Sequence, residues 1–213
     1  MTHMHPRRLV LASDNAGKLA ELQALLEPLQ IEVLPQRLLG VVGAVEPHST
    51  FLENALAKAR HAAQASGLPA LADDSGLCCV ALNDSPGVRS ARFAGDGAGD
   101  AQNNAQLVAR LAGIEDRRAH YVCLLVAMRS PQDPEPIVAE GRWFGRIVTE
   151  PRGTNGFGYD PYFWVDELGA TAAELAPQQK NSLSHRAQAM RHLSSTLAAR
   201  WSWGPSPSRE RGG

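Results

Sequence analysis

The stretch PALADDSGLCCVAL, residues 69–82, places two adjacent carboxylates between two apolar runs. This pattern predicts a pair of buried strands interrupted at Asp73 and Asp74. Open α/β sheets bind ligands at the carboxyl ends of their strands, so we expect the acidic pair to belong to a ligand site. Adjacent strand residues point to opposite faces of a sheet, and only one of the two is therefore expected to face a shared pocket.

Two interpretations of the acidic pair follow from its chemistry. Carboxylates at the end of a buried strand bind a hard cation such as Mg²⁺ or remove a proton from water. Alternatively, an aspartate turn uses one carboxylate to accept nearby backbone N–H groups. The pattern alone leaves both interpretations open.

On the N-terminal side, strand and helix signals alternate. RLVLAS, from Arg8, predicts a strand, SDNAGK a loop, and leucines at helical spacing predict a helix after it. IEVLPQ predicts a second strand. HSTFLENALAKARHAAQASG predicts a helix with Ser49 or Thr50 as its N-cap and Gly67 as its end.

On the C-terminal side, AQNNAQLVARLAGI predicts a helix, RAHYVCLLVAMRS a strand, and PIVAEGRWFGRIV a hairpin-like pair turning at Gly141 or Gly145. EPRGTNGFGYDPYFWV predicts a glycine-rich loop followed by a strand, and residues 171–201 predict one or two helices interrupted at Pro177. The chain is therefore expected to be an α/β protein with a mixed sheet, one domain over residues 1–203, and a disordered tail over residues 204–213.

Composition excludes several classes of protein. The 213 residues are 44% hydrophobic, enough for a substantial core, and the net charge of -1 gives no field for binding a polyanion. The longest apolar run, YVCLLVAM, is far shorter than the roughly 20 residues that cross a bilayer. Three cysteines without paired spacing favour a reducing cytoplasm, and no targeting segment is recognised.

Two segments carry groups suited to phosphates. SDNAGK places small residues at a helix N-terminus before Lys18, an arrangement that binds anions but that an ordinary capped helix also has. Glu53 and Lys58 lie in the next predicted helix, where an acid in the first turn is favoured by the helix dipole regardless of function. Solvated helix charges are the common fate of such residues.

Two later segments carry groups suited to a base. GTNGFGYDP surrounds Phe157 with glycines, which either exposes the ring for stacking on a base or buries it in a tight turn. KNSLSHR gathers Lys180, His185 and Arg186, which offer an anion contact and donors for a carbonyl. Together with the acidic pair, these groups suit a nucleoside triphosphate.

The same stretches resemble a known family, the inosine and xanthosine triphosphate pyrophosphatases. The matching motifs are LASDNAGKLAEL, TFLENALAKARHAA, LADDSGL, PGVRSARFAG, GTNGFGYDPYF, TAAEL and KNSLSHRAQAM, in the order of the family. They span residues 11–190. The resemblance implies an elongated central mixed sheet flanked by helices, with two lobes enclosing a nucleotide cleft, and a homodimer.

It also implies Mg²⁺-dependent hydrolysis of ITP, dITP and XTP to the nucleoside monophosphate and pyrophosphate, which removes deaminated purines from the nucleotide pool. Neither nucleic acid nor membrane is expected as a partner. By resemblance, Asp74 is the general base and Ser75 contacts substrate. Glu53 and Asp74 match metal-linked acids, with Asp73 a possible helper. The positions facing the triphosphate are Ser13, Asp14, Asn15, Ala16, Gly17, Lys18, Lys58 and Lys180.

The base-binding loop corresponds to Phe157, Gly158, Tyr159 and Asp160, and the reader of the purine 6-oxo group to His185 with Arg186. One departure is that Cys78, Cys79 and Val80 follow the acidic motif, where the family often has an acidic residue. Three rival interpretations are a hydrolase for modified pyrimidine triphosphates or one releasing orthophosphate, a nucleotide-binding regulator without turnover, and an RNA-binding protein, which the near-neutral charge disfavours.

Overall fold

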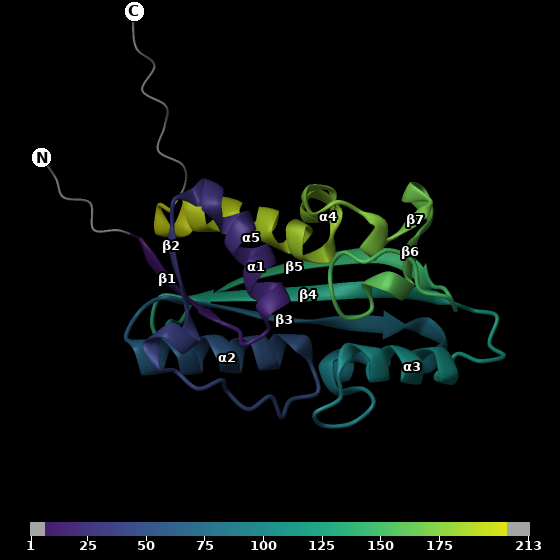
Figure 1. The fold of residues 1–213 in the computed structure, drawn as a ribbon. Coiled ribbons are helices and arrows are strands. Elements are labelled where there is room, and N and C mark those ends of the chain that lie inside the picture. The colour runs from purple at the N-terminus through teal and green to yellow at the C-terminus, as the bar shows by residue number, and fades with distance from the viewer. Residues whose placement is uncertain (1–6, 204–213) are drawn as a thin grey trace, which may run out of the picture.

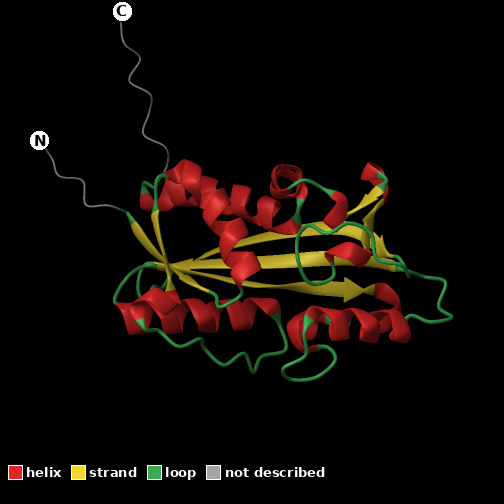
Figure 2. Cartoon of the chain, viewed as in Figure 1, coloured by secondary structure: helices red, strands yellow, loops and turns green. Residues whose placement is uncertain are grey.

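The computed structural model describes residues 7–203, which form one seven-stranded mixed sheet in the order β2-β1-β3-β4-β5-β6-β7 (Figures 1 and 2). β1 pairs in parallel with β2 and β3, and the remaining pairs are antiparallel. The mixed α/β sheet is therefore confirmed, whereas the division into two lobes stays a prediction, and the expected tail from Gly204 lies outside the described residues. The strands are β1 (Arg8–Ala12), β2 (Glu32–Pro35), β3 (Ala70–Cys79), β4 (Arg118–Met128), β5 (Ile137–Ile147), β6 (Phe163–Val165) and β7 (Ala170–Thr171).

Helices cover both faces of the sheet. α2 and α3 lie along one face, and α1, α4 and α5 lie on the other (Figure 1). The alanine-rich side of α2 packs closely on Ala70 and Val122, while leucines of α1 and α5 pack on Leu71 and Leu125. The helices are α1 (Ala16–Leu26), α2 (Phe51–Ser66), α3 (Asp100–Arg110), α4 (Pro177–Leu183) and α5 (His185–Trp201).

The helix predicted over HSTFLENALAKARHAAQASG is confirmed, together with its ends. The side chain of Thr50 accepts a hydrogen bond from the Glu53 amide at 3.2 Å, which makes Thr50 the N-cap of α2. Gly67 ends the helix at φ +68, a left-handed conformation that glycine adopts without a steric penalty.

The prediction of two strands interrupted by the acidic pair is wrong, because β3 is continuous. Asp73 pairs with Leu125 and Asp74 with Leu124 in an antiparallel ladder that runs without a break to Cys79. The ladder tolerates both charges because cations reach Asp73 from one face of the sheet and Asp74 from the other.

The predicted turn at Gly141 or Gly145 and the predicted helix interruption at Pro177 are also wrong. No turn occurs at Gly141 or Gly145, since both lie within the single strand β5, and the hairpin is formed instead by β4 and β5. Glycine is required at both positions because backbone of a neighbouring element lies where a Cβ would be. Pro177 does not interrupt a helix but is the first residue of α4. An N–H group at this position would have no acceptor within the helix, so the absence of one in proline costs no hydrogen bond.

The sheet narrows at the acidic pair. β1 ends at Ala12, opposite Ala72, whereas β3 continues to Cys79. Asp73 and Asp74 therefore lie in the middle of β3 but immediately beyond the carboxyl end of β1, where the edge of β3 has lost its parallel partner. This is the position in which α/β sheets bind ligands.

A substitution at Gly141 tests how closely α5 packs on β5. A Cβ at Gly141 would lie 2.0 Å from the His185 carbonyl oxygen and 2.6 Å from the Ala189 nitrogen, both backbone atoms of α5. We expect Gly141→Ala to displace the start of α5 and to lower the free energy of unfolding by about 1–3 kcal/mol in urea titration. Ser195→Ala, at an exposed position of α5 itself, is the control and should stay within about 0.5 kcal/mol of wild type. An unchanged Gly141→Ala protein would refute this account.

Candidate active site

Two adjoining cavities meet at the open edge of β3. One has a volume of about 300 Å³ and the other about 180 Å³, and both are lined by Asn15, Lys18, Ser75 and Ala91. The larger cavity is lined by aromatic rings and by residues of α4 and α5, while the smaller is lined by the 13–18 loop and by carboxylates. The arrangement resembles one cleft with two chemically different ends.

The 13–18 loop forms one wall of the smaller cavity. Asn15 caps α1 by accepting a hydrogen bond from the Lys18 amide at 3.0 Å, and Asp14 accepts one from Arg37 at 3.0 Å. Ser13, Asp14, Asn15 and Lys18 line the cavity, whereas Ala16 and Gly17 form the first turn of α1 without lining it. The N-terminus of α1 therefore opens toward the cleft, as an anion-binding helix requires.

Asp73 is the centre of a buried ion-pair network. Its carboxylate lies 2.6 Å from Lys18 Nζ and 3.1 Å from Arg186 Nε, and it accepts a hydrogen bond from the Ser75 hydroxyl at 2.9 Å. Burial alone would raise the pKa of the Asp73 carboxyl, but Lys18 and Arg186 outweigh it and hold that pKa well below its usual range. Asp73 is therefore a permanent anion that joins α1 and α5 to β3.

Asp74 has a different environment on the other face of the sheet. Its carboxylate lies 2.8 Å from Lys58 Nζ and 3.4 Å from the amide nitrogen of Asn54, both on α2. Burial raises the pKa of the Asp74 carboxyl, and Lys58 and Lys18 offset only part of this rise. Of the two aspartates, Asp74 is thus the better proton acceptor.

The expectation that only one aspartate faces a shared pocket is wrong. Asp73 and Asp74 point to opposite faces, yet both line the smaller cavity. The reason is that β1 ends at Ala12, so the cavity extends around the unpaired edge of β3 and reaches both sides.

A second carboxylate near Lys58 comes from Glu46, which sequence analysis did not single out. Glu46 Oε1 lies 3.2 Å from Lys58 Nζ, so one ammonium group is shared between Glu46 and Asp74. Glu53, by contrast, is exposed, accepts a hydrogen bond from the Thr50 hydroxyl at 2.6 Å, and lines neither cavity. Glu53 could be predicted from the sequence because it lies in the first turn of a recognisable helix. Glu46 could not, because it lies in an irregular loop that gives no local signal.

The carboxylate oxygens around Lys58 are suitable ligands for a hard divalent cation. Asp74 and Glu46 supply carboxylate oxygens, the ligands that Mg²⁺ prefers, and the Lys58 ammonium already lies between them as a positive charge. Burial lowers the pKa of Lys58, but Asp74 and Glu46 outweigh it and raise that pKa overall. The local field therefore favours positive charge.

The glycine-rich loop forms one wall of the larger cavity. Phe157 packs so closely on the first turn of α1 that a Cβ on Gly17 would lie 2.4 Å from its ring, and Lys180 Nζ lies 4.9 Å from the ring centroid. Gly158 is held on α3, donating to Asp100 at 2.7 Å and accepting from Asn104 at 2.9 Å. The half-buried Phe157 ring thus lines the cavity in a fixed position.

Asp160 fixes the conformation of this glycine-rich loop. It accepts hydrogen bonds from the Phe157 amide at 2.9 Å and from the Tyr121 hydroxyl at 3.2 Å, and it forms an ion pair with Lys180. Lys180 also contacts Glu21 of α1 at 2.8 Å. Tyr159 is buried, and its hydroxyl donates to the Ser90 carbonyl at 2.8 Å. Tyr159, Asp160 and Lys180 all line the larger cavity.

His185 and Arg186 are the first two residues of α5, and both line the larger cavity. The His185 ring stacks on Tyr121 with centroids 4.6 Å apart, and within the described residues its buried Nδ1 has no hydrogen-bond partner. Burial, followed by the nearby Arg186 charge, holds the pKa of His185 well below its usual value, so the ring is neutral. Arg186 is almost fully enclosed by bonds to Asp73, Glu21 and Ser75.

Three residues that were not predicted from the sequence organise the site. Glu21 pairs with Lys180 and Arg186, Glu46 pairs with Lys58, and Tyr121 supports both His185 and Asp160. Glu21 had a detectable signal, since it lies one turn after Lys18 on α1. Tyr121 had none, because its position depends on the register of β4. Cys78, Cys79 and Val80 line neither cavity.

Comparison with known proteins identifies the family of this chain. The sequence model of the Ham1 family matches residues 9–196. The chain is 60% identical over 190 residues to the dITP/XTP pyrophosphatase of Ralstonia nicotianae, covering 88% of this chain and 94% of that protein. It is 61% identical over 191 residues to the dITP/XTP pyrophosphatase of Aromatoleum aromaticum, covering 90% and 96%.

Solved structures give the same result. A HAM1 protein from Coxiella burnetii superposes with a TM-score of 0.84 at 50% identity, covering 91% of this chain and 99% of that one. A protein from Mycobacterium abscessus described as a nucleoside-triphosphatase / dITP/XTP pyrophosphatase superposes with a TM-score of 0.70 at 42% identity, covering 89% and 99%. With a family match over most of its length and relatives of this identity, the chain belongs to the Ham1 family.

Proposed function

We propose that this chain hydrolyses ITP, dITP and XTP to the nucleoside monophosphate and pyrophosphate with Mg²⁺, and so removes deaminated purines from the nucleotide pool. The observation that carries the proposal is the two-ended cleft. An aromatic cavity with an unpartnered buried imidazole nitrogen adjoins a smaller cavity lined by a helix N-terminus, lysines and carboxylates. The names of the curated relatives, dITP/XTP pyrophosphatase, support the same substrates.

In this proposal the purine base of the substrate binds in the larger cavity. Phe157 offers a ring face for stacking, and the neutral His185 imidazole would donate its ring N–H to a 6-oxo group. Adenine carries an amino group at that position, so the donor would be left without an acceptor. Selectivity for 6-oxo purines over ATP follows from this single contact.

The reaction takes place in the smaller cavity. Asp74 accepts a proton from water, the water oxygen bonds to the α-phosphorus, and the bond from that phosphorus to the β-phosphate oxygen breaks to release pyrophosphate. Lys18, Lys58 and the N-terminus of α1 offset the phosphate charge. Mg²⁺, when bound, supplies further charge neutralisation. Asp73 is a positioning residue, because its lowered pKa makes it a poor proton acceptor.

We propose that Asp74 and Glu46 hold the cation, with Glu53 as the alternative second ligand that the family resemblance suggested. Glu46 is supported by its place in the smaller cavity and by the lysine that it shares with Asp74. Glu53 has the weaker support of lying in the same helix as Lys58.

Two wider features are also proposals. A homodimer is supported by the uncovered side of β5, where Phe144 is 66% and Val138 48% exposed. A cytoplasmic location is supported by three buried cysteines that form no disulfide. Within residues 7–203, no helix is long and apolar enough to cross a bilayer.

Hydrolysis of ITP, XTP, dITP, GTP and ATP with Mg²⁺, scoring pyrophosphate and orthophosphate separately, tests the activity. We expect pyrophosphate from ITP, dITP and XTP, and a kcat/KM for ATP about 10- to 100-fold lower, the effect of one unpaired donor. Asp74→Asn should lower kcat by about 10²–10⁴-fold while the circular dichroism spectrum is unchanged. Orthophosphate as the product, or equal use of ATP, would refute the proposal.

Asp73→Asn should act on stability as well as on catalysis. Because the pKa of Asp73 is lowered by folding, its contribution is complete well above the unfolded-state pKa of about 3.9 and is lost progressively as the pH falls through that value toward the lower folded-state pKa. We expect Asp73→Asn to cost about 3–5 kcal/mol near pH 7, because Lys18 and Arg186 lose their common anion.

Urea unfolding at neutral pH and at about pH 2 measures this difference, which should shrink at the lower pH because the unfolded chain then binds a proton at Asp73. Asp74→Asn is the matched control, and since folding raises the pKa of Asp74, its loss should cost far less. Equal costs for the two variants would contradict the different roles given to them.

A pair of glutamate variants decides the second cation ligand. We expect Glu46→Gln to raise the Mg²⁺ concentration needed for half-maximal activity by about tenfold or more, because a carboxylate ligand is lost. Glu53→Gln should leave the Mg²⁺ dependence unchanged and lower only the stability of α2, by about 1 kcal/mol or less. The reverse pattern would place Glu53 at the cation instead.

A further inference from the structure

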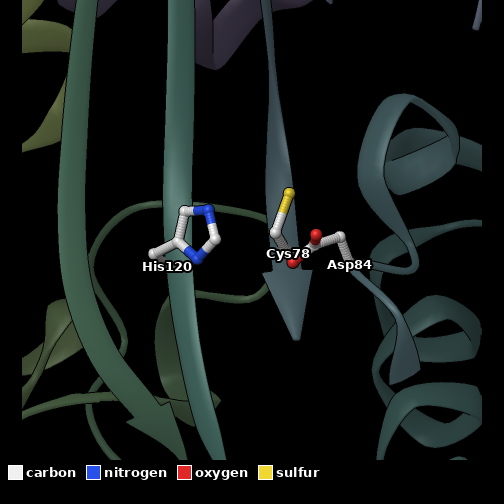
Figure 3. A group of neighbouring side chains, drawn as sticks. All are labelled: Cys78, Asp84 and His120. Carbon is white, nitrogen blue, oxygen red and sulfur yellow. The ribbon is translucent and has the colours of Figure 1, made fainter. Parts of the chain in front are cut away.

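Three side chains of metal-binding type converge outside the cleft. Cys78 lies near the end of β3, His120 lies on β4, and Asp84 lies in the turn after β3 (Figure 3). One ligand atom from each residue lies within 4.8 Å of the other two. None of the three lines either cavity of the cleft.

The strand register creates two of these positions. Cys78 and His120 are directly opposite each other in the antiparallel β3–β4 ladder, so their side chains point to the same face of the sheet. Because Cys78 and His120 belong to the continuous ladder, their spacing is set by backbone hydrogen bonds and not by side-chain flexibility.

The turn after β3 fixes the third position. The Asp84 amide donates to the Cys79 carbonyl at 3.1 Å, and the Cys79 amide donates to the Ser85 carbonyl at 3.1 Å. Asn83 and Asp84 have φ values of 50 and 60, a left-handed conformation that asparagine and aspartate tolerate better than most residues. The chain thus folds back and brings the Asp84 carboxylate beside Cys78.

The groups are also available for a ligand. Cys78 forms no disulfide, and within residues 7–203 no hydrogen bond or ion pair reaches the Asp84 carboxylate. His120 Nε2 lies 3.3 Å from Nη1 of Arg142, a half-exposed cation that also pairs with Glu140. Arg142 can therefore turn away from His120 and keep its acidic partner.

We propose that Cys78, Asp84 and His120 bind a zinc ion at a site separate from the cation of the cleft. Thiolate, imidazole and carboxylate are the three ligand types that zinc takes, whereas Mg²⁺ and Ca²⁺ prefer oxygen alone. One thiolate and one carboxylate together balance the charge of a divalent ion. Three protein ligands leave the fourth tetrahedral position to water.

Binding requires one proton to leave. Burial, followed by the charge of Asp84, raises the pKa of the Cys78 thiol to about 11, so the thiol is protonated near neutral pH. As the zinc–sulfur bond forms, the S–H bond breaks and the proton passes to solvent, with no change in oxidation state. Calorimetry in buffers of different ionisation enthalpy should therefore report release of about one proton for each zinc bound.

Titration with Co²⁺, a spectroscopic substitute for zinc, tests the site in the presence of saturating Mg²⁺. The thiolate-to-cobalt charge-transfer absorption reports only a site that contains cysteine, so a cation in the cleft does not contribute. We expect one equivalent of Co²⁺ to produce this absorption in the wild-type protein, and one equivalent of zinc to abolish it.

Four variants assign the ligands. Cys78→Ser should abolish the absorption, and Asp84→Asn and His120→Gln should each weaken Co²⁺ binding by about tenfold or more. Cys79→Ser is the matched control, because Cys79 is equally buried but packs on the opposite face of β3. Asp84 is exposed, so its variant tests the site without endangering the fold. Absence of the absorption in wild type, or its persistence at full strength in Cys78→Ser or Asp84→Asn, would overturn the proposal.

Discussion

The ion-pair network at Asp73 is the interaction on which the cleft depends. A buried carboxylate is stable only when cations and hydrogen bonds replace its lost hydration, and here Lys18 comes from α1 and Arg186 from α5. Glu21 of α1 then satisfies Arg186 on its other side. Because each partner comes from a different element, the charges are balanced only in the assembled fold. The same interaction that stabilises the protein therefore positions both walls of the cleft.

Each lysine in the cleft already has an acidic partner. Lys58 is shared by Asp74 and Glu46, and Lys180 by Asp160 and Glu21. The lysines are thus held in place before any phosphate arrives, which reduces the conformational entropy that binding must overcome. A triphosphate with a divalent cation would exchange partners with these pairs: phosphates take the ammonium groups, and the cation takes carboxylates. Preorganised charge of this kind stabilises a transition state without further rearrangement.

The features that sequence predicts well here are those encoded by neighbouring residues. Thr50 and Gly67 mark both ends of α2, and the 13–18 loop precedes a helix as its capping pattern indicates. Features set by distant pairing were not predictable in the same way. The continuity of β3 depends on its ladder with β4 and on cations supplied from both faces, and glycines in β5 that suggested a turn are instead required by backbone packed against them. Glu46 and Tyr121 join the site only through tertiary contacts.

The early end of β1 has a consequence for the backbone of β3. Amide groups alternate between the two edges of a strand, and those of Leu77 and Cys79 bond to Ser90 and Ser85 on the side away from β4. By this alternation the Ser75 amide points to the same edge, three residues beyond Ala72, the partner of the last residue of β1, where both cavities meet. A main-chain donor at that point belongs to every variant of Ser75 except proline. The unpaired edge of β3 therefore offers a hydrogen-bond donor at the junction of the two cavities whatever side chain stands at position 75.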